Sequence, residues 1–482
     1  MKSRLAAHPV LFGCLFVLQG YAAFQPMGSI QDLFFYLAVV SGAIFILQLV
    51  FSICVRQPRK PAILTSACVV FFCFMGEWRL QLGYWAEGTN WLWLARMRWL
   101  LPITGTFFFF LCGWVLRTSK PLLTTRRYLD AVSSLLVAVT LVGIFRAPPP
   151  PVLRSGESAQ VPLSLGSHPP DIYFILTDAY TSPESLKAYW GYDDSAFVNG
   201  LTGLGFRVIK NARSNATFTP ICLATYLDMK YPPAPPQGWV QPTGVAWCCR
   251  IIAQAEAPLR LKASGYDLRL LSIFDVAGKP RYYTFPGLIR PTLGDFLSSR
   301  LAVEMLGAER IFESFGDMNL KLFSLLPQIA AERSDKPKFV YAHVMMPHWP
   351  YLFDEQGRRV RRGKRPEEGR PEDYLGQLIY ENTLITNAVA GILKNSKTPP
   401  IIILQGDHGY RSLPGPHKFE EGTTILNALY LPGSQADWLY PGITPVNTFR
   451  LIFNHYFGQH YSYLPDIVPT LASPLAVLPD DK

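Results

Sequence analysis

Hydrophobic residues are concentrated in the first third of the chain, where charged residues are sparse. A membrane-spanning helix needs about 20 predominantly apolar residues. Five apolar stretches lie in this region, at residues 9–24, 33–55, 62–75, 101–116 and 128–145. The second and fifth have the required length, whereas the third and fourth must borrow flanking residues to cross a bilayer. The pattern therefore predicts a transmembrane domain of about five helices over residues 1–146.

A proline-rich linker, residues 147–170, follows the apolar third. Its four consecutive prolines favour a stiff polyproline II spacer. Beyond it, helical patterns alternate with short strands that are apolar throughout, at residues 171–178, 206–212, 266–274, 338–346, 400–407 and 425–433. Such alternation is typical of an α/β domain whose mostly parallel sheet is covered by helices on both faces. The same pattern predicts a helix over 182–205, capped by Ser182, and another over 376–396.

Loop charges predict how the helices cross the membrane. The 482-residue chain has a formal net charge of +10 and a mean hydropathy of +0.15, which is high for a soluble enzyme. Basic residues gather before the first stretch, after the second and after the fourth: Lys2, Arg4, Arg56, Arg59, Lys60, Arg117, Lys120, Arg126 and Arg127. The positive-inside rule then predicts a cytoplasmic N-terminus, and five spans place the C-terminal domain outside the cytoplasm. A cleaved signal peptide in place of the first span is the alternative, but Tyr21-Ala22-Ala23 is a weak cleavage site.

Two further features concern the outer domain. The run "GRRVRRGKR", residues 357–365, favours attraction to anionic headgroups or phosphorylated glycolipid, because nucleic acid is an unattractive partner outside the cell. A solvated loop is the simpler interpretation of the same run. Three cysteines lie outside the apolar stretches, where a disulfide from Cys222 to Cys248 or Cys249 is permitted.

Several predicted strands end next to side chains suited to chemistry. Asp178 closes the first strand, His348 follows the strand at 338–346, and the strand at 400–407 ends on Asp407, with His408 next. Since ligand sites in parallel sheets lie at the carboxyl ends of strands, we expect these residues to converge. Thr219 precedes a helical segment, so its hydroxyl would lie near the free N–H groups of a helix N-terminus.

These residue types suit a cation and an activated hydroxyl. Asp178 and Asp407 supply oxygen, His408 supplies nitrogen, and Thr219 would complete a four-coordinate site for one divalent metal ion, Zn, Mn or Mg. A cation-bound hydroxyl loses its proton more easily and becomes a nucleophile, as phosphoryl or sulfuryl transfer requires. Each residue also has a structural interpretation, because an Asp after a strand or a Thr before a helix is often only a cap.

Five segments occur in the order expected of the alkaline phosphatase superfamily: "PPDIYFILTDAYT", "NARSNATFTPICLATYLDM", "AHVMMPHWPYLFD", "IIILQGDHG" and "ILNALYLPG…ITPVNTFRLIFNHYFG". Over residues 169–458 the chain resembles its sulfatase-like, membrane-anchored branch, similar to lipoteichoic acid synthases and lipid A phosphoethanolamine transferases. The resemblance implies an alkaline phosphatase-like outer domain on a protein of the bacterial inner or plasma membrane.

The resemblance also implies roles for single residues. It implies four metal ligands: Asp178, Thr219, Asp407 and His408. Thr219 stands at the position of the nucleophile, and His348, in a His-x-Pro-aromatic segment, at that of a substrate-phosphate contact. His417 falls where another substrate-binding His lies. In a protonated form, His348 could also act as a general acid toward the leaving oxygen.

The chain departs from the family pattern at several points. The two transferase families mostly use Glu where Asp178 stands, and Thr217 is an alternative nucleophile two residues before Thr219. No His has an Asp four residues before it, so the Asp-x-x-x-His motif of two-metal members is missing and one catalytic metal is predicted. Cys222 lacks the Cys-x-Pro-x-Arg pattern that sulfatases convert to formylglycine, which favours phosphate over sulfate esters.

Together these features predict a membrane-anchored, metal-dependent phosphotransferase or phosphoesterase that forms a phospho-threonine intermediate. The expected substrates are phospholipid headgroups or envelope glycans, and nucleic acid is not expected as a partner. Two alternatives stay open: a sulfate or phosphonate ester hydrolase on the same fold, and a non-enzymatic envelope scaffold.

Overall fold

The computed structural model describes residues 6–24, 30–86, 91, 97–146, 161–233, 242–283, 293–298, 301, 308–360, 371–411, 417–433 and 437–469. The chain forms two compact units. The first, called the membrane unit below, comprises Met1–Val152, Val240–Ala246 and Pro286–Glu309. The second, called the sheet unit, comprises Leu153–Trp239, Trp247–Phe285 and Arg310–Lys482. Most of the predicted linker, residues 147–160, lies outside the described residues.

The membrane unit is built from five N-terminal helices: α1 (His8–Phe24), α2 (Ile30–Cys54), α3 (Lys60–Ala86), α4 (Met97–Arg117) and α5 (Leu123–Arg146). Within the described residues, four apolar segments are long enough to cross a membrane: Ile30–Cys54, Lys60–Arg79, Trp99–Arg117 and Leu123–Arg146. Helix α1 has 17 residues, fewer than the roughly 20 that a span needs. The predicted helical N-terminal bundle is confirmed with five helices, four of which are long enough to span a membrane, and a fifth span stays a prediction.

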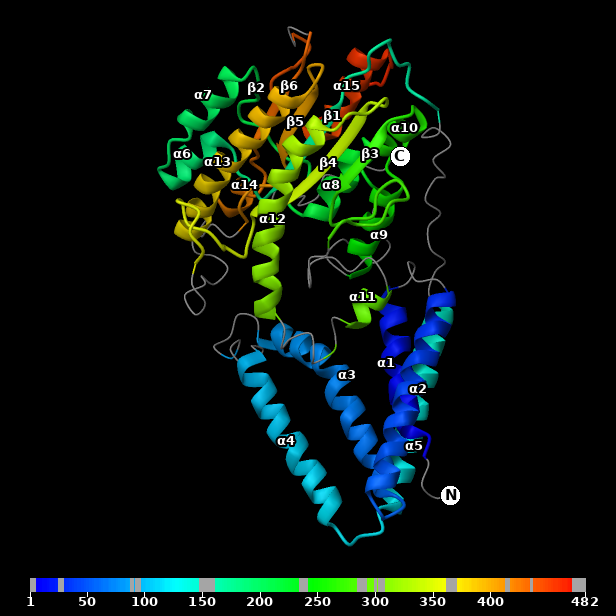
Figure 1. The fold of residues 1–482 in the computed structure, drawn as a ribbon. Coiled ribbons are helices and arrows are strands. Elements are labelled where there is room, and N and C mark those ends of the chain that lie inside the picture. The colour runs from blue at the N-terminus through cyan, green and yellow to red at the C-terminus, as the bar shows by residue number, and fades with distance from the viewer. Residues whose placement is uncertain are drawn as a thin grey trace. The chain divides into compact units, whose positions relative to one another are not determined.

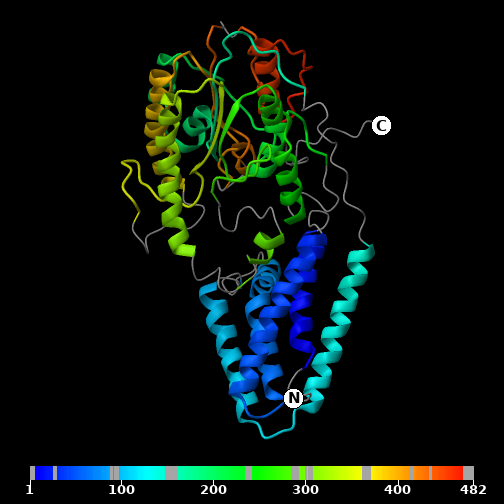
Figure 2. The ribbon, with the colours of Figure 1, turned by 45° about the vertical axis from the view of Figure 1, so that its right-hand side comes forward.

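Helix α1 lies at the centre of this bundle. It packs against α2, α3 and α5, with Phe16, Val17 and Leu18 buried. Helix α4 rests on α3, where the rings of Phe71 and Phe108 stack 4.7 Å apart. Figures 1 and 2 both show α4 and α5 on different sides of the bundle. The short helix α11 (Leu293–Ser298) belongs to the same unit and packs on α1 and α2.

The sheet unit contains a six-stranded sheet in the order β2-β6-β5-β1-β4-β3. The strands are β1 (Ile172–Asp178), β2 (Arg207–Val208), β3 (Asp267–Leu271), β4 (Lys338–Pro347), β5 (Ile401–Gly406) and β6 (Asn427–Tyr430). Strands β5, β1, β4 and β3 are parallel, whereas β6 runs antiparallel to β5 and β2 runs antiparallel to β6. The three longest strands, β1, β4 and β5, are buried at every position, as expected for a sheet covered on both faces.

Helices lie on both faces of this sheet (Figure 1). The helices that follow α5, besides α11, are α6 (Pro183–Trp190), α7 (Ser195–Gly203), α8 (Thr219–Asp228), α9 (Pro242–Ala253), α10 (Glu256–Ala263), α12 (Ala308–Ala331), α13 (Pro371–Asn395), α14 (Lys418–Glu421) and α15 (Thr448–Phe457). Helix α13 contacts β4. From α15, Phe449 packs edge-on against Phe174 of β1 and Phe339 of β4. The predicted α/β fold with a mostly parallel, helix-covered sheet is confirmed.

Some local predictions needed adjustment. Ser182 caps α6 as predicted, since its hydroxyl accepts a hydrogen bond from the Ser185 amide. The predicted helix over 182–205 is in fact α6 and α7, because Gly191 adopts a φ of 64° that ends α6. Cys222, Cys248 and Cys249 are buried, and none of them forms a disulfide in this structure.

Candidate active site

Two neighbouring parallel strands bring the predicted carboxylates together. Strands β1 and β5 pair in register, so that Thr177 lies opposite Gly406. Asp178, the last residue of β1, therefore lies beside Asp407 and His408, which follow β5. All three side chains are fully buried. Their potential ligand atoms lie within 4.8 Å of one another, which could hold a metal ion.

Thr219 joins this cluster from the first residue of α8. Its Oγ1 lies 3.4 Å from Asp178 Oδ2 and 3.3 Å from His408 Nε2. Thr217, the alternative nucleophile, instead contributes its backbone carbonyl, which accepts a hydrogen bond from Arg411. The fold thus brings together the four predicted ligands, which are far apart in the sequence.

Two carboxylate oxygens of the cluster accept no hydrogen bond from the described residues, although His408 Nε2 lies 3.8 and 3.5 Å from them. Asp178 Oδ1 and Asp407 Oδ2 are buried and, within the described residues, accept no hydrogen bond. Asp407 Oδ1, in contrast, accepts from the amides of Ala179 and His408, at 2.9 and 2.8 Å. Unpartnered buried carboxylate oxygens cost free energy unless a ligand meets them. The donor set therefore fits a divalent cation.

The electrostatics of the two carboxyl groups support the same interpretation. Burial and the nearby Asp178 carboxylate raise the pKa of Asp407 to about 7. Burial alone would also raise the pKa of Asp178, but the neighbouring His348 and His343 bring it below its usual range. Two carboxylates this close resist joint ionisation without a positive charge between them. A bound cation would remove that conflict.

His343 is a contact of the site that the sequence analysis leaves without a role. It is fully buried in β4, and its Nε2 lies 3.2 Å from Asp178 Oδ2. Its Nδ1 lies 3.3 Å from the Tyr341 hydroxyl. These contacts fix the ring and orient Asp178. In the sequence, His343 could have been noticed as a histidine inside a largely apolar strand. Its contact with Asp178 depends on the pairing of β1 with β4, which the sequence does not show.

Arg411 is a second such residue, and it contacts His348. Its Nη2 lies 3.3 Å from His348 Nε2, and its Nη1 donates to the Thr217 carbonyl at 3.2 Å. His348 Nδ1 lies 2.5 Å from the Trp349 carbonyl, so Nδ1 carries the proton and Nε2 faces the guanidinium as an acceptor. Burial and Arg411 lower the pKa of His408 to about 3, which keeps that imidazole neutral as a ligand.

The structure does not bring His417 together with the four predicted ligands among the contacts of the described residues. Its exposed ring stacks on Tyr189 with centroids 4.8 Å apart, and its Nδ1 lies 3.7 Å from Glu420 Oε2. Residues 412–416, just before it, lie outside the described part of the chain. Substrate binding by His417 stays a prediction.

A buried carboxylate ties together the two loops that carry the cluster. Glu421 accepts hydrogen bonds from the Thr181 hydroxyl at 2.7 Å, from Trp190 Nε1 at 3.0 Å and from the Ser185 hydroxyl. Thr181 follows Asp178 by three residues, and Glu421 lies beyond His408 in the other loop. Glu421 therefore holds the ends of β1 and β5 in a fixed relation.

Gly409 permits the close approach of these loops. A Cβ at this position would lie 2.5 Å from the Thr424 carbonyl oxygen and closer still to that of Glu421. We expect Gly409→Ala to displace the His408 loop and to destabilise the protein by about 1–3 kcal/mol. The matched control is Gly200→Ala in α7, where a Cβ would meet nothing within 4 Å. Thermal unfolding midpoints and metal content should fall for Gly409→Ala alone, and equal behaviour of the two variants would contradict this account.

Comparison with known proteins finds one matching family model and several solved structures of similar fold. Residues 312–449 match the family model described as Sulfatase. No curated protein matches the chain. Among solved structures, the C-terminal periplasmic domain of EcEptC from Escherichia coli, in complex with Zn, is similar with 14% identity and a TM-score of 0.41, covering 64% of this chain and 91% of that one. The lipoteichoic acid synthase LtaP from Listeria monocytogenes is similar with 12% identity and a TM-score of 0.38, covering 62% and 76%.

A third solved structure is BT1596, a 2-O GAG sulfatase, with 12% identity, a TM-score of 0.38 and coverage of 65% of this chain and 76% of that one. The segment matched by the family model contains β4, His348 and the Asp407-His408 pair. The predicted resemblance is thereby confirmed, since residues 312–449 match the sulfatase family model.

Proposed function

We propose that the protein is a membrane-anchored, metal-dependent phosphotransferase or phosphoesterase in which Thr219 is the nucleophile. The observation that carries this proposal is the convergence of its hydroxyl with Asp178, Asp407 and His408 around two unpartnered carboxylate oxygens. The sulfatase-family match supports an enzyme that acts on sulfate or phosphate esters. Buried Cys222, without the sequence that formylglycine formation requires, favours phosphate.

Four atoms would hold one divalent cation, Zn, Mn or Mg: Asp178 Oδ1, Asp407 Oδ2, His408 Nε2 and Thr219 Oγ1. When bound, the cation would lower the pKa of the hydroxyl and balance the two carboxylates. His408 can present Nε2 because its Nδ1 donates to the Gly409 carbonyl at 2.8 Å.

The chain's own residues then account for the two half-reactions. Thr219 Oγ1 loses its proton and attacks phosphorus, an O–P bond forms, and the bond from phosphorus to the leaving oxygen breaks as that oxygen takes up one proton. Water or an acceptor hydroxyl next loses a proton and attacks the phospho-threonine, and the released Thr219 oxygen regains a proton. Arg411 lies next to His348 beside this centre, where its guanidinium can donate to the phosphoryl oxygens. General acid catalysis by His348 would require its Nε2 to gain a proton and turn away from Arg411.

The membrane helices and the loop charges support a substrate at the envelope. We infer that the sheet unit faces the extracytoplasmic side of a bacterial inner or plasma membrane and acts on phospholipid headgroups or envelope glycans. In the basic run, Arg358 pairs with Asp354 and Arg359 with Asp317, so these two charges are partly neutralised. Residues 361–365 of the run lie outside the described residues, and attraction of the run to lipid stays a prediction.

The proposal is tested with the purified full-length protein and three ester classes. Turnover of an aryl phosphate, a phosphodiester and an aryl sulfate should be compared in the presence of Zn, Mn or Mg. We expect phosphate ester turnover and, by intact mass, a phosphoryl adduct on Thr219. Preferred turnover of the sulfate ester would favour the sulfatase alternative, to which the family match points. Absence of both turnover and adduct would favour a non-enzymatic scaffold.

Arg411 offers a separate test of anion binding. Loss of a charge-assisted hydrogen bond costs about 1.5–3 kcal/mol, so Arg411→Gln should lower kcat/KM about 10–100-fold and weaken inhibition by inorganic phosphate. Arg411→Lys should restore part of the loss because it keeps the charge without the guanidinium geometry. Unchanged phosphate inhibition in Arg411→Gln would remove this residue from the binding site.

A further inference from the structure

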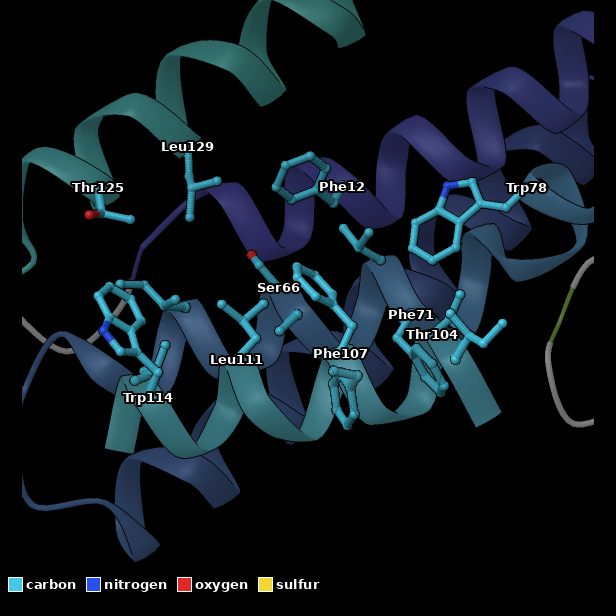
Figure 3. A pocket seen from close by; sticks show the side chains of 16 residues that line it. Phe12, Ser66, Phe71, Trp78, Thr104, Phe107, Leu111, Trp114, Thr125 and Leu129 are labelled. Atoms are coloured by element: carbon cyan, nitrogen blue, oxygen red, sulfur yellow. The ribbon is translucent and has the colours of Figure 1, made fainter. Parts of the chain in front are cut away.

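The membrane unit contains a cavity of about 530 Å³ (Figure 3). It lies between α3 and α4, with contributions from α1 and α5. Apart from a few hydroxyl groups, its walls are apolar: Phe12, Ile63, Phe71, Trp78, Phe107 and Trp114 are among the lining residues. The volume and the apolar walls are typical of a ligand-binding pocket. We refer to this cavity as the α3–α4 groove.

The packing of the bundle explains why the groove exists. Helix α4 rests on α3, whereas α5 rests on α1, although only a short connection separates α4 from α5. The two helices therefore diverge around α3. Phe107 and Trp114 of α4 line the groove and are 70% and 51% exposed in the protein alone. In a bilayer, hydrocarbon must cover these rings.

The dimensions of the groove suit a lipid chain. On α3 its lining extends from Ile63 to Trp78, which is roughly 22 Å at a rise of 1.5 Å per residue. One leaflet contributes roughly 15 Å to the hydrocarbon core. The groove can therefore accept an extended acyl chain that starts at one end of the helices.

One end of the groove is strongly basic. There α3 begins, α4 ends and α5 begins, and the charged residues of this end are Arg56, Arg59, Lys60, Arg117, Lys120, Arg126, Arg127 and Asp130. The Lys60 side chain is buried, and its Nζ donates to the Leu116 carbonyl at 2.7 Å, which leaves its other N–H donors for further acceptors. Arg126 pairs with Asp130 at 3.9 Å, so among the described residues of this end seven basic side chains stand against one carboxylate. This charge excess is complementary to an anionic headgroup.

We propose that the α3–α4 groove binds an anionic phospholipid, with one acyl chain along α3 and α4 and the phosphate at the basic end. The site does not depend on the proposed reaction. The residues that line the groove all belong to the membrane unit, whereas Thr219 belongs to the sheet unit, so the proposed lipid is distinct from a substrate of the Thr219 centre. Such a lipid would brace α4 against the rest of the bundle.

Lipid retention by the full-length protein tests this proposal. The protein is delipidated in detergent, and native mass spectrometry records adducts with phosphatidylglycerol and with phosphatidylcholine of the same acyl chains. We expect retention of phosphatidylglycerol at about 5-fold or more above phosphatidylcholine. Ala67→Phe, at a lining position of α3, should abolish this adduct. The matched control Val139→Phe, at a position of α5 that is 62% exposed, should leave it unchanged.

A further variant distinguishes binding of the lipid headgroup from binding of the acyl chain. Arg59→Gln should reduce the preference for phosphatidylglycerol without changing retention of phosphatidylcholine. If Ala67→Phe fails to fold, Val70→Phe fills the groove from another lining position. Equal retention of the two lipids, or an adduct that survives both groove-filling variants, would mean annular lipid only and would overturn the proposal.

Discussion

Replacement of Thr219 by alanine is expected to lower kcat for a phosphate ester by at least about 10³-fold, because it removes the attacking oxygen. Thr219 is the residue whose hydroxyl lies within 3.4 Å of both Asp178 and His408. Thr219→Ser keeps a hydroxyl at the same place and should retain turnover. Intact mass spectrometry should find the phosphoryl adduct in the wild type and lose it in Thr219→Ala.

Thr217, two residues before Thr219, provides the comparison variant for this experiment. Thr217 offers its backbone carbonyl to Arg411, and its own hydroxyl was the alternative nucleophile in the sequence. If Thr217→Ala abolishes the adduct while Thr219→Ala keeps it, the assignment is wrong by two residues. Both variants should melt near the wild-type temperature, because a Thr to Ala change at these positions removes little volume.

Replacement of Asp407 by asparagine is expected to lower metal affinity by about 10²-fold or more and to reduce turnover accordingly. Its Oδ2 is one of the two carboxylate oxygens of the cluster that accept no hydrogen bond from the described residues, and an amide there cannot supply negative charge. Elemental analysis of the purified protein measures bound metal directly. A chelator should inactivate the wild type, and addition of Zn, Mn or Mg should restore turnover.

The control for this variant is Asp335→Asn, an exposed position before β4. It makes the same chemical change away from the cluster and should keep full metal content. Without metal, the neutral amide removes the carboxylate repulsion, so Asp407→Asn should unfold at a higher temperature than metal-free wild type at pH 8. Full metal occupancy in Asp407→Asn would refute the proposed ligand set.

The sheet and its ligand edge follow from short-range sequence patterns. Apolar runs of strand length, each followed by Asp or His, predict that Asp178 and Asp407-His408 meet, because parallel strands present their carboxyl ends at one edge. The register of β1 with β5 places these residues as that pattern implies. Helix α8 begins at Thr219 for an equally local reason, since Pro220 suits the first turn of a helix.

Only the tertiary structure shows which side chains from distant segments of the sequence contact one another. The position of His343 beside Asp178 needs the pairing of β1 with β4, and the contact of Arg411 with His348 needs two loops 63 residues apart. Likewise, the sequence permits a disulfide from Cys222, but in the fold its buried thiol donates to the Ala216 carbonyl and forms no disulfide.

For this protein, the sequence by itself determined the apolar helices, the α/β sheet and the residue types at its ligand edge. These features depend on the periodicity of side chains along a single element, which is a local property. Only the tertiary structure decided which carboxylate oxygens stay unpartnered, which nitrogen of His348 faces Arg411, and where α4 leaves a groove on α3. Those features arise from packing between elements, where register and rotamer together set each distance.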